Sequence, residues 1–252
     1  MDAVKPCGTG PSCGSALAQP PEAVLLRDIH FSWPGQTRET LHIPHFAVPC
    51  GGQVFISGPS GSGKSTLLSL VGGILIPASG SVIIGGTCLN ALNGAQRDAL
   101  RGDRIGFIFQ QFNLVPYLSI MDNVLIPCRL SAIRRNRAAE RDGSPEQAAA
   151  SLLERLDITP DVWGRQATRL SVGQQQRVAA ARALIGSPPL LIADEPTSAL
   201  DAEHREDFLR LLKRECKRVQ SSLLFVSHDQ NLGQGFHSQV RLADLHPPGE
   251  EA

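Results

Sequence analysis

The stretch Gly58-Pro59-Ser60-Gly61-Ser62-Gly63-Lys64-Ser65-Thr66 decides how this chain folds. It follows an apolar run at 53–57 and leads into a segment whose leucines recur at helical spacing. A glycine-rich turn between a strand and a helix binds phosphate, because backbone N–H groups and the positive helix end point at the ligand. We expect Lys64 to reach the β- and γ-phosphates of ATP and the Ser65 hydroxyl to ligate Mg²⁺. The two flanking elements disfavour the alternative, a glycine-rich turn that binds nothing.

A second apolar run, Leu190-Leu191-Ile192-Ala193, ends in two carboxylates, Asp194 and Glu195. Such a run is typical of a buried parallel strand, and α/β sheets bind ligands at the carboxyl ends of their strands. We expect Asp194 to hold Mg²⁺ through water and Glu195 to act as the general base toward the attacking water. The alternative is a pair of surface carboxylates in a turn, which the preceding buried run disfavours.

The remaining motifs resemble those of the ABC ATPases. The run Leu170-Ser171-Val172-Gly173-Gln174-Gln175-Gln176-Arg177 resembles the signature motif of that family. The segment 107–114 with Gln110 is similar to the Q-loop, Ser198-Ala199-Leu200-Asp201 is similar to the D-loop, and His228 lies in a matching Val-Ser-His-Asp run. All stand in the family's order between about residues 24 and 245. The chain therefore resembles the ATP-binding subunit of an ABC transporter.

The resemblance implies an active site shared by two ATPase subunits, which we expect to be identical. They would pack head to tail, so that Ser171, Gly173 and Gln174 of one subunit close over ATP held by the phosphate loop of the other. The signature would lie at the start of a helix predicted at 174–185, whose free N–H groups suit the γ-phosphate. Hydrolysis would open the dimer, and this opening would drive an integral membrane permease subunit.

The resemblance also assigns roles to single residues. It implies that Glu195 is the base, that His228 contacts the γ-phosphate, and that Gln110 is a Mg²⁺ ligand and sensor. Asp201 is expected to contact the partner subunit across the dimer, and Trp33 to stack on adenine. Trp33 has a second interpretation, as a core aromatic residue at the end of the first strand, because another aromatic side chain lies two positions earlier.

Within the family, the chain resembles the lipoprotein-release and macrolide-export group through segments 89–92, 100–102, 105–116 and 122–124. This favours export or extraction of lipid-linked or hydrophobic substrates. Two positions depart from the pattern: Val172 stands where most members have glycine, and Ser198-Ala199 replaces the usual Gly-Asn. A β-branched residue tolerates positive φ poorly, so Val172 is expected to alter the signature loop or slow turnover without abolishing hydrolysis.

The predicted fold class is α/β: a P-loop NTPase core of the ABC ATPase type with a mixed sheet, an N-terminal antiparallel β region and a helical subdomain. Strand-like runs lie at 24–31, 53–57, 82–84, 105–109, 190–193 and 223–226. We predict a single ABC ATPase domain at 23–245, between a disordered leader at 1–22 and a frayed tail at 246–252. It divides into a RecA-like core at 23–113 and 172–245 and a helical subdomain at about 114–171. In that subdomain Ser144, Pro145 and Gln147 are typical of a capping box.

Composition limits the partners. Lys and Arg together number 24, as do Asp and Glu, so net charge gives no support for nucleic acid as a partner. The six cysteines have no CxxC spacing, which predicts reduced thiols and no cysteine metal site.

Neither an apolar run of ~20 residues nor a secretory signal is present, which predicts a cytoplasmic subunit held at the inner face of the membrane by its permease. A basic stretch is interpreted as a solvated loop or helix face: Arg134, Arg135, Arg137 and Arg141.

Three other functions compete with that of a transporter ATPase. A DNA-repair or chromosome-organising ATPase would need a long heptad run between the two halves of the ATPase, and the sequence has none. A translation-type protein of this superfamily would carry two phosphate loops in one chain, and one is present here. A regulatory or adaptor subunit with slow hydrolysis is disfavoured by Glu195 and His228 and favoured by Val172. The transporter ATPase is the leading interpretation.

Overall fold

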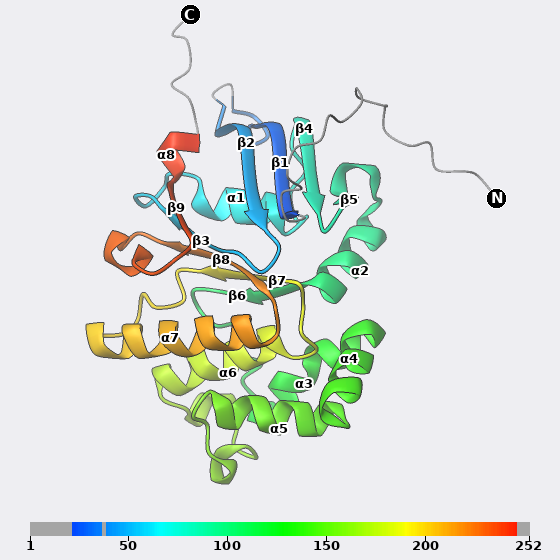
Figure 1. Ribbon diagram of the computed structural model, residues 1–252, viewed down its shortest axis with the longest axis vertical. Helices are drawn as coiled ribbons and strands as arrows, with labels where there is room; N and C mark the ends of the chain where they lie inside the picture. The colour runs from blue at the N-terminus through cyan, green and yellow to red at the C-terminus, as the bar shows by residue number, and fades with distance from the viewer. Residues whose placement is uncertain (1–21, 37–38, 246–252) are drawn as a thin grey trace, which may run out of the picture.

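The computed structural model describes residues 22–36 and 39–245, and its central layer is a parallel β-sheet (Figure 1). The strand order is β6-β7-β8-β3-β9, and every neighbouring pair runs parallel. The carboxyl ends of these strands therefore lie along one edge of the sheet. The strands are β3 (Gln53–Ser57), β6 (Ile105–Ile108), β7 (Leu190–Asp194), β8 (Ser222–Ser227) and β9 (Ser238–Arg241). All but β9 were predicted, and β9 escaped because it is short and polar.

The second sheet is antiparallel, with the order β2-β1-β4-β5. Its strands are β1 (Glu22–Phe31), β2 (Leu41–Pro49), β4 (Ser79–Ile84) and β5 (Thr87–Cys88). The antiparallel and parallel strands thus form two separate hydrogen-bonded sheets. The sequence indicated β1 and β4 but not β2, because Pro44 and Pro49 interrupt its strand pattern. As an edge strand, β2 tolerates the missing proline N–H groups.

The parallel sheet separates two hydrophobic cores. Val54 and Ile56 of β3 belong to the core shared with the antiparallel sheet and helix α1 (Lys64–Val71). Phe55 points to the opposite core, which contains helices α6 (Val172–Leu184) and α7 (Ala202–Arg218). Side chains alternate between the faces of a strand, so burial of both faces gives the continuous apolar runs seen in the sequence.

The segment between β6 and α6 is helical, and the structure describes all of it (Figure 1). It contains α3 (Ile120–Leu130), α4 (Ala132–Asp142) and α5 (Pro145–Arg155), followed by the short 3-10 helices η2 (Pro160–Val162) and η3 (Ala167–Arg169). The Ser144 hydroxyl accepts the Gln147 N–H and caps α5, which is one half of the predicted capping box. The remaining helices are η1 (Leu89–Ala91), α2 (Gly94–Arg104), η4 (Gln230–Gly233) and α8 (Leu242–Leu245). The borders proposed for the helical subdomain stay predictions.

The basic stretch is not uniformly solvated, which corrects the interpretation made from the sequence. Arg134 is only 3% exposed, and its guanidinium donates hydrogen bonds to the carbonyl oxygens of Ala183 and Ile185 at the end of α6. Burial lowers the pKa of this guanidinium to about 10, so it remains charged at neutral pH. The neighbouring Arg135 is exposed, as the prediction required. A buried arginine is held by carbonyl oxygens that the helix end leaves without partners, which sequence patterns do not reveal.

Both predicted terminal segments lie outside the described residues, except that Glu22 is the first residue of β1. Four cysteines fall in the described part of the chain and are free thiols: Cys50, Cys88, Cys128 and Cys216. Among the helices of 22–36 and 39–245, none is both long and apolar enough to span a membrane.

Candidate functional site

The phosphate loop joins β3 to α1 and is shaped by glycine. Gly61 and Gly63 have φ values of 77° and 96°, in the left-handed region that other residues rarely adopt. A Cβ atom on Gly63 would also lie 2.9 Å from the Leu41 side chain, so no larger residue fits there. The buried Lys64 begins α1, and its Nζ donates to the carbonyl oxygens of Gly58 and Pro59, both at 2.8 Å. The loop therefore wraps around the lysine amine.

Two carboxylates face this loop from the end of β7. Asp194 is the last residue of the strand, and the Ser65 hydroxyl donates to its Oδ2 at 3.4 Å. Burial raises the pKa of the Asp194 carboxyl, and the negative charge of Glu195 raises it further, against the opposing effects of Ser65 and Lys64. A cation beside Asp194 would favour its charged form.

Glu195 stands at the centre of the site. Its Oε1 lies 3.4 Å from Lys64 Nζ, and its Oε2 lies 2.7 Å from Nδ1 of His228, which follows β8. The Glu195 side chain is 14% exposed and the His228 side chain 54%, so the glutamate is largely buried and the histidine faces solvent. Glu195 has a φ of 43°, an uncommon backbone conformation for a residue other than glycine. Such strain is often stored at functional positions.

Lys64, Asp194 and Glu195 line one cavity of about 350 Å³, whereas His228 is not among its lining residues. Trp33 and Gln110 come to it from the segments after β1 and β6, which are distant in sequence from the phosphate loop. Trp33 is 41% exposed, so its interpretation as a core residue is wrong. Thr40 was not predicted as a site residue, because the strand β2 that follows it was not predicted. The lining residues are Trp33, Thr40, Ser60, Gly61, Gly63, Lys64, Ser65, Thr66, Gln110, Asp194 and Glu195.

The residues present fit a magnesium nucleotide. Oxygen ligands suit Mg²⁺, and the Ser65 hydroxyl, the Asp194 carboxylate and the Gln110 amide can supply them in this cavity. Ser62 supplies an independent sign: its buried hydroxyl has no hydrogen-bond partner among the described residues. A buried polar atom without a partner is rare and indicates a missing ligand or water. Gly58, Pro59 and Ser62 are not among the residues that line this cavity.

The signature residues Ser171, Gly173 and Gln174 line a different cavity, of about 200 Å³. The two cavities share no lining residue. Helix α6 begins at Val172, two residues earlier than predicted, because the Ser171 hydroxyl and the Gln174 side chain form a reciprocal capping box. One chain therefore carries the phosphate loop and the signature on separate surfaces.

The backbone strain expected at Val172 is absent, whereas the expected effect on turnover stays a prediction. The residue occupies the first helical position of α6 and does not belong to the described residues with positive φ. No left-handed conformation is needed there, so a β-branched side chain fits without backbone strain. Its side chain is 46% exposed and stands between two signature residues.

The predicted dimer contact, Asp201, is the N-cap of α7 and lines neither cavity. Its carboxylate accepts hydrogen bonds from the backbone N–H of His204 at 3.0 Å and pairs with the ring Nδ1 at 2.7 Å. These contacts lower the pKa of Asp201 and raise the pKa of His204. His204 lines the signature cavity, so Asp201 lies directly beside it.

Comparison with known proteins places this geometry in a family. Residues 41–198 match the family model described as "ABC transporter". The chain is 38% identical to the uncharacterized ABC transporter ATP-binding protein MJ0796 of Methanocaldococcus jannaschii over 198 residues. The aligned residues make up 79% of this chain and 83% of that protein. A solved structure of MJ0796, a dimeric post-hydrolysis state bound to ADP and Pi, matches with a TM-score of 0.72 at 32% identity, over 86% of this chain and 93% of that one.

Two further relatives carry transport names. The lipoprotein-releasing system ATP-binding protein LolD 1 of Chlorobium chlorochromatii is 37% identical over 209 residues, which is 82% of each chain. The macrolide export ATP-binding/permease protein MacB of Syntrophobacter fumaroxidans is 38% identical over 194 residues, which is 77% of this chain but 26% of that protein. The chain belongs to the ABC transporter family and is an ATP-binding, ATP-hydrolysing member of it.

Proposed function

We propose that this chain is the motor subunit of an ABC transporter and that two copies share their active sites around ATP. The observation that carries this proposal is the separation of the two half-sites. The phosphate loop lines one cavity, whereas Ser171, Gly173 and Gln174 line another that has no residue in common with it. A single chain therefore cannot bring both half-sites to one nucleotide, but a second copy placed head to tail can.

The signature half-site suits the end of a triphosphate. Helix α6 starts there and has no acidic residue in its first turn. Its free N–H groups and the positive end of its dipole attract negative charge. ATP would thus hold the two copies together, and loss of the γ-phosphate would remove the attraction and release them. The opening is the step that can move a membrane partner.

Within the phosphate half-site we assign roles from the contacts. Lys64, wrapped by the loop, binds the β- and γ-phosphates, and Glu195 accepts the proton of the attacking water. His228 holds the second oxygen of Glu195 and faces the γ-phosphate. Trp33 stacks on adenine. Mg²⁺, held by Ser65, Asp194 and Gln110, would neutralise phosphate charge.

These contacts favour a hydrolysing motor over a slow adaptor subunit. The base and its histidine are in contact at 2.7 Å. The one feature that favoured the adaptor, strain at Val172, is removed by its helical backbone conformation.

Glu195→Gln should lower the steady-state rate of ATP hydrolysis by about 10²- to 10⁴-fold, or about 3 to 5 kcal/mol of activation free energy, because the amide cannot accept the proton. ATP affinity should be retained, since Lys64 and the loop are unchanged. The matched control is Glu154→Gln, at an exposed position on α5. A Glu195→Gln chain that turns over at the wild-type rate would remove this residue from the role of base.

The same variant tests the shared site. Glu195→Gln protein should change from monomer to dimer when Mg²⁺ and ATP are added, as measured by light scattering after gel filtration. Adding Ser171→Asp should prevent this change, because aspartate caps a helix as well as serine does but repels the phosphate. If both proteins dimerise equally with ATP, the signature does not close over the nucleotide.

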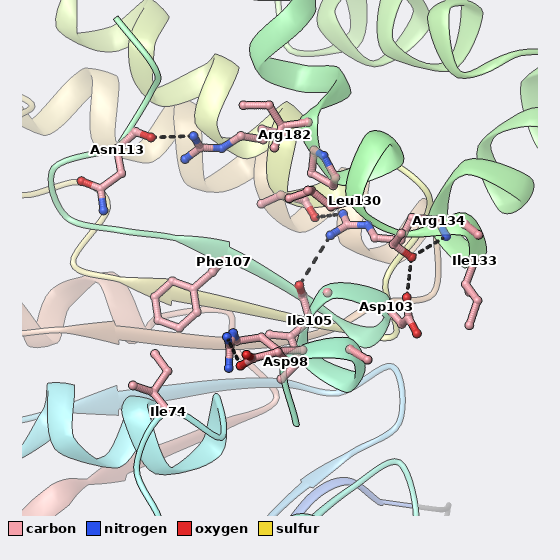
Figure 2. A pocket seen from close by; sticks show the side chains of 18 of the residues that line it. Ile74, Asp98, Asp103, Ile105, Phe107, Asn113, Leu130, Ile133, Arg134 and Arg182 are labelled. Carbon is pink, nitrogen blue, oxygen red and sulfur yellow. Dashed lines mark hydrogen bonds and ion pairs between the residues drawn. The ribbon is translucent and has the colours of Figure 1, made fainter. Parts of the chain in front are cut away.

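The second part of the proposal concerns the membrane partner. A groove of about 800 Å³ lies between α2, β6, α3 and α4 (Figure 2). Its lining includes three exposed apolar side chains, Ile74, Leu130 and Ile133, which are 54%, 81% and 46% exposed. Exposed apolar patches of this kind mark interaction sites. We assign the groove to an apolar helix of the permease subunit.

The groove is linked to the nucleotide cavity by one short segment. Asn113 lines the groove and follows Gln110, which lines the nucleotide cavity. Arg182 of α6 donates a hydrogen bond to the carbonyl oxygen of Asn113 at 2.6 Å (Figure 2). It donates a second one to the carbonyl oxygen of Phe112 at 2.5 Å. The segment is therefore tied to the signature helix, so a change at the γ-phosphate can reach the groove. With such a partner the chain would lie at the inner face of the membrane. The names of two relatives, a lipoprotein-releasing and a macrolide export protein, favour lipid-linked or hydrophobic substrates.

Leu130→Glu should reduce recovery of the chain with membranes that contain its permease by about 10-fold or more, because the charge would be buried against an apolar helix. Recovery is measured by co-sedimentation, and the melting temperature checks folding. The control is Arg210→Glu, on the exposed face of α7 outside the groove. Equal recovery of the Leu130→Glu chain and the wild type would show that the permease binds elsewhere.

A further inference from the structure

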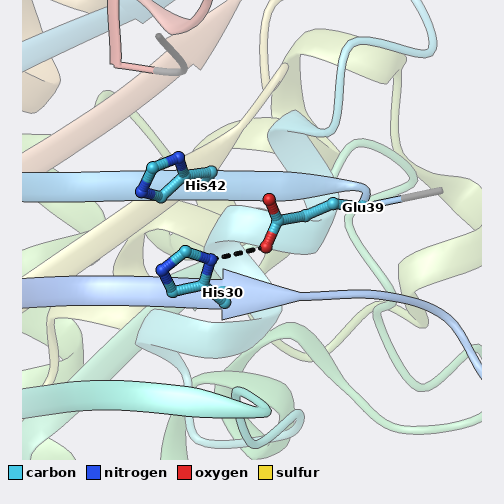
Figure 3. Close-up of side chains that lie close together, drawn as sticks. All are labelled: His30, Glu39 and His42. Atoms are coloured by element: carbon cyan, nitrogen blue, oxygen red, sulfur yellow. Dashed lines mark hydrogen bonds and ion pairs between the residues drawn. The ribbon is translucent and has the colours of Figure 1, made fainter. Parts of the chain in front are cut away.

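We infer that His30, Glu39 and His42 form a binding site for a transition-metal ion of the Zn²⁺ class, on the antiparallel sheet and separate from the Mg²⁺ ligands. His30 lies in β1 and His42 in β2, and the two residues are directly opposite each other in the strand pairing. Glu39 stands just before β2. Figure 3 shows the three side chains side by side at this end of the two strands.

The geometry brings the ligand atoms together. The two imidazole rings are stacked, with centroids 4.2 Å apart and planes at 20°. Glu39 Oε1 lies 2.7 Å from Nδ1 of His30. One ligand atom from each of the three residues can be chosen so that all lie within 4.8 Å of one another. Tetrahedral coordination at the usual Zn–N and Zn–O distances needs about 3.3 Å between ligand atoms, so small side-chain rotations suffice.

The donor set determines the kind of ion. Imidazole nitrogen suits Zn²⁺, Co²⁺, Ni²⁺ and Cu²⁺, whereas Mg²⁺ and Ca²⁺ take oxygen ligands. Two imidazoles and one carboxylate leave a fourth position for water. The His30 and Glu39 side chains are 40% and 38% exposed, so an ion can enter from solvent and the side chains can turn. The ring of His42 stacks on that of His30, which brings a second imidazole within reach of the same ion.

The position of the site gives it a consequence for the nucleotide. His30 and Glu39 bracket the segment that carries Trp33, and Glu39 is followed by Thr40; both Trp33 and Thr40 line the nucleotide cavity. A metal ion would fix the two ends of this segment to each other. Since coupling between two ligands is reciprocal, nucleotide affinity should then depend on the ion. Metal binding itself does not rest on the proposed function, whereas this coupling rests on the role of Trp33.

No sequence pattern indicated this site. The three residues do not form a compact metal motif, and β2 was not predicted, so the opposition of His30 and His42 across two strands was not visible. None of the four cysteines in the described part of the chain belongs to the cluster.

The test is a titration of the full chain with Zn²⁺ against a chromophoric chelator, in the presence of excess Mg²⁺ to occupy the oxygen ligands near Asp194. Co²⁺ titration followed by visible absorption reports whether nitrogen ligands are bound. The wild type and the control His45→Ala, at an exposed position of the same strand, should bind one ion at the same affinity. His42→Ala should weaken Zn²⁺ binding by about 100-fold or more, because it removes a direct ligand. Loss of a residue that only hydrogen-bonds to a ligand weakens metal binding by about 10- to 100-fold.

Glu39→Gln provides a second variant outside the strands, in case His42→Ala disturbs the sheet. It should also weaken binding, and Zn²⁺ should raise the melting temperature of the wild type but not of this variant. The inference is overturned if the wild type binds no Zn²⁺, or if His42→Ala and Glu39→Gln bind it as well as His45→Ala does. Zn²⁺ binding that leaves the affinity for a fluorescent ATP analogue unchanged would contradict the coupling alone. A chain that binds Zn²⁺ but binds no analogue, either with or without the ion, would count against the nucleotide site instead.

Discussion

The contacts of Glu195 with Lys64 and His228 depend on the parallel arrangement of three neighbouring strands. Lys64 follows β3, Glu195 follows β7 and His228 follows β8, and these strands are adjacent in the order β7-β8-β3. Parallel strands end at the same edge, so residues that are more than 100 positions apart in sequence meet there. Gln110 follows β6 and reaches the same edge. An antiparallel arrangement would send half of these residues to the opposite end of the sheet.

The signature residues, which we propose as the second half-site, line a different cavity from the one at this edge. Helix α6 packs in the core on the other face of the parallel sheet, and its first turn opens at the surface beside Ser171. The buried Gln176 of this helix donates a hydrogen bond to the carbonyl oxygen of Pro196, next to Glu195, at 2.9 Å. This hydrogen bond ties the signature helix to the segment that follows β7 within one chain. In the proposed function, a nucleotide that contacts both half-sites would connect two chains, so ATP would link the two copies.

Much of the site could be predicted from the sequence because its parts are local. A strand, a glycine-rich turn and a helix are contiguous around Lys64, and a buried strand leads directly to Glu195. Features that depend on contacts between distant segments were missed or misjudged. Pro44 concealed β2, and with it Thr40 and the pairing of His30 with His42. Arg134 looked solvated because its carbonyl partners lie about 50 residues away. Val172 was misjudged because the capping box at Ser171 fixes a helical backbone that residue preference alone did not indicate.

The central claim is that each active site takes its phosphate loop from one chain and its signature from another. Mixing two inactive variants tests it most directly. Lys64→Ala removes the phosphate half-site and Ser171→Asp the signature half-site, so each homodimer lacks an intact site. Mixed dimers contain one intact site, and a 1:1 mixture should recover up to about a quarter of the wild-type rate of ATP hydrolysis, since half of the dimers are mixed and each has one of two sites. A mixture as inactive as its components, or a Ser171→Asp chain as active as the wild type, would contradict the shared site.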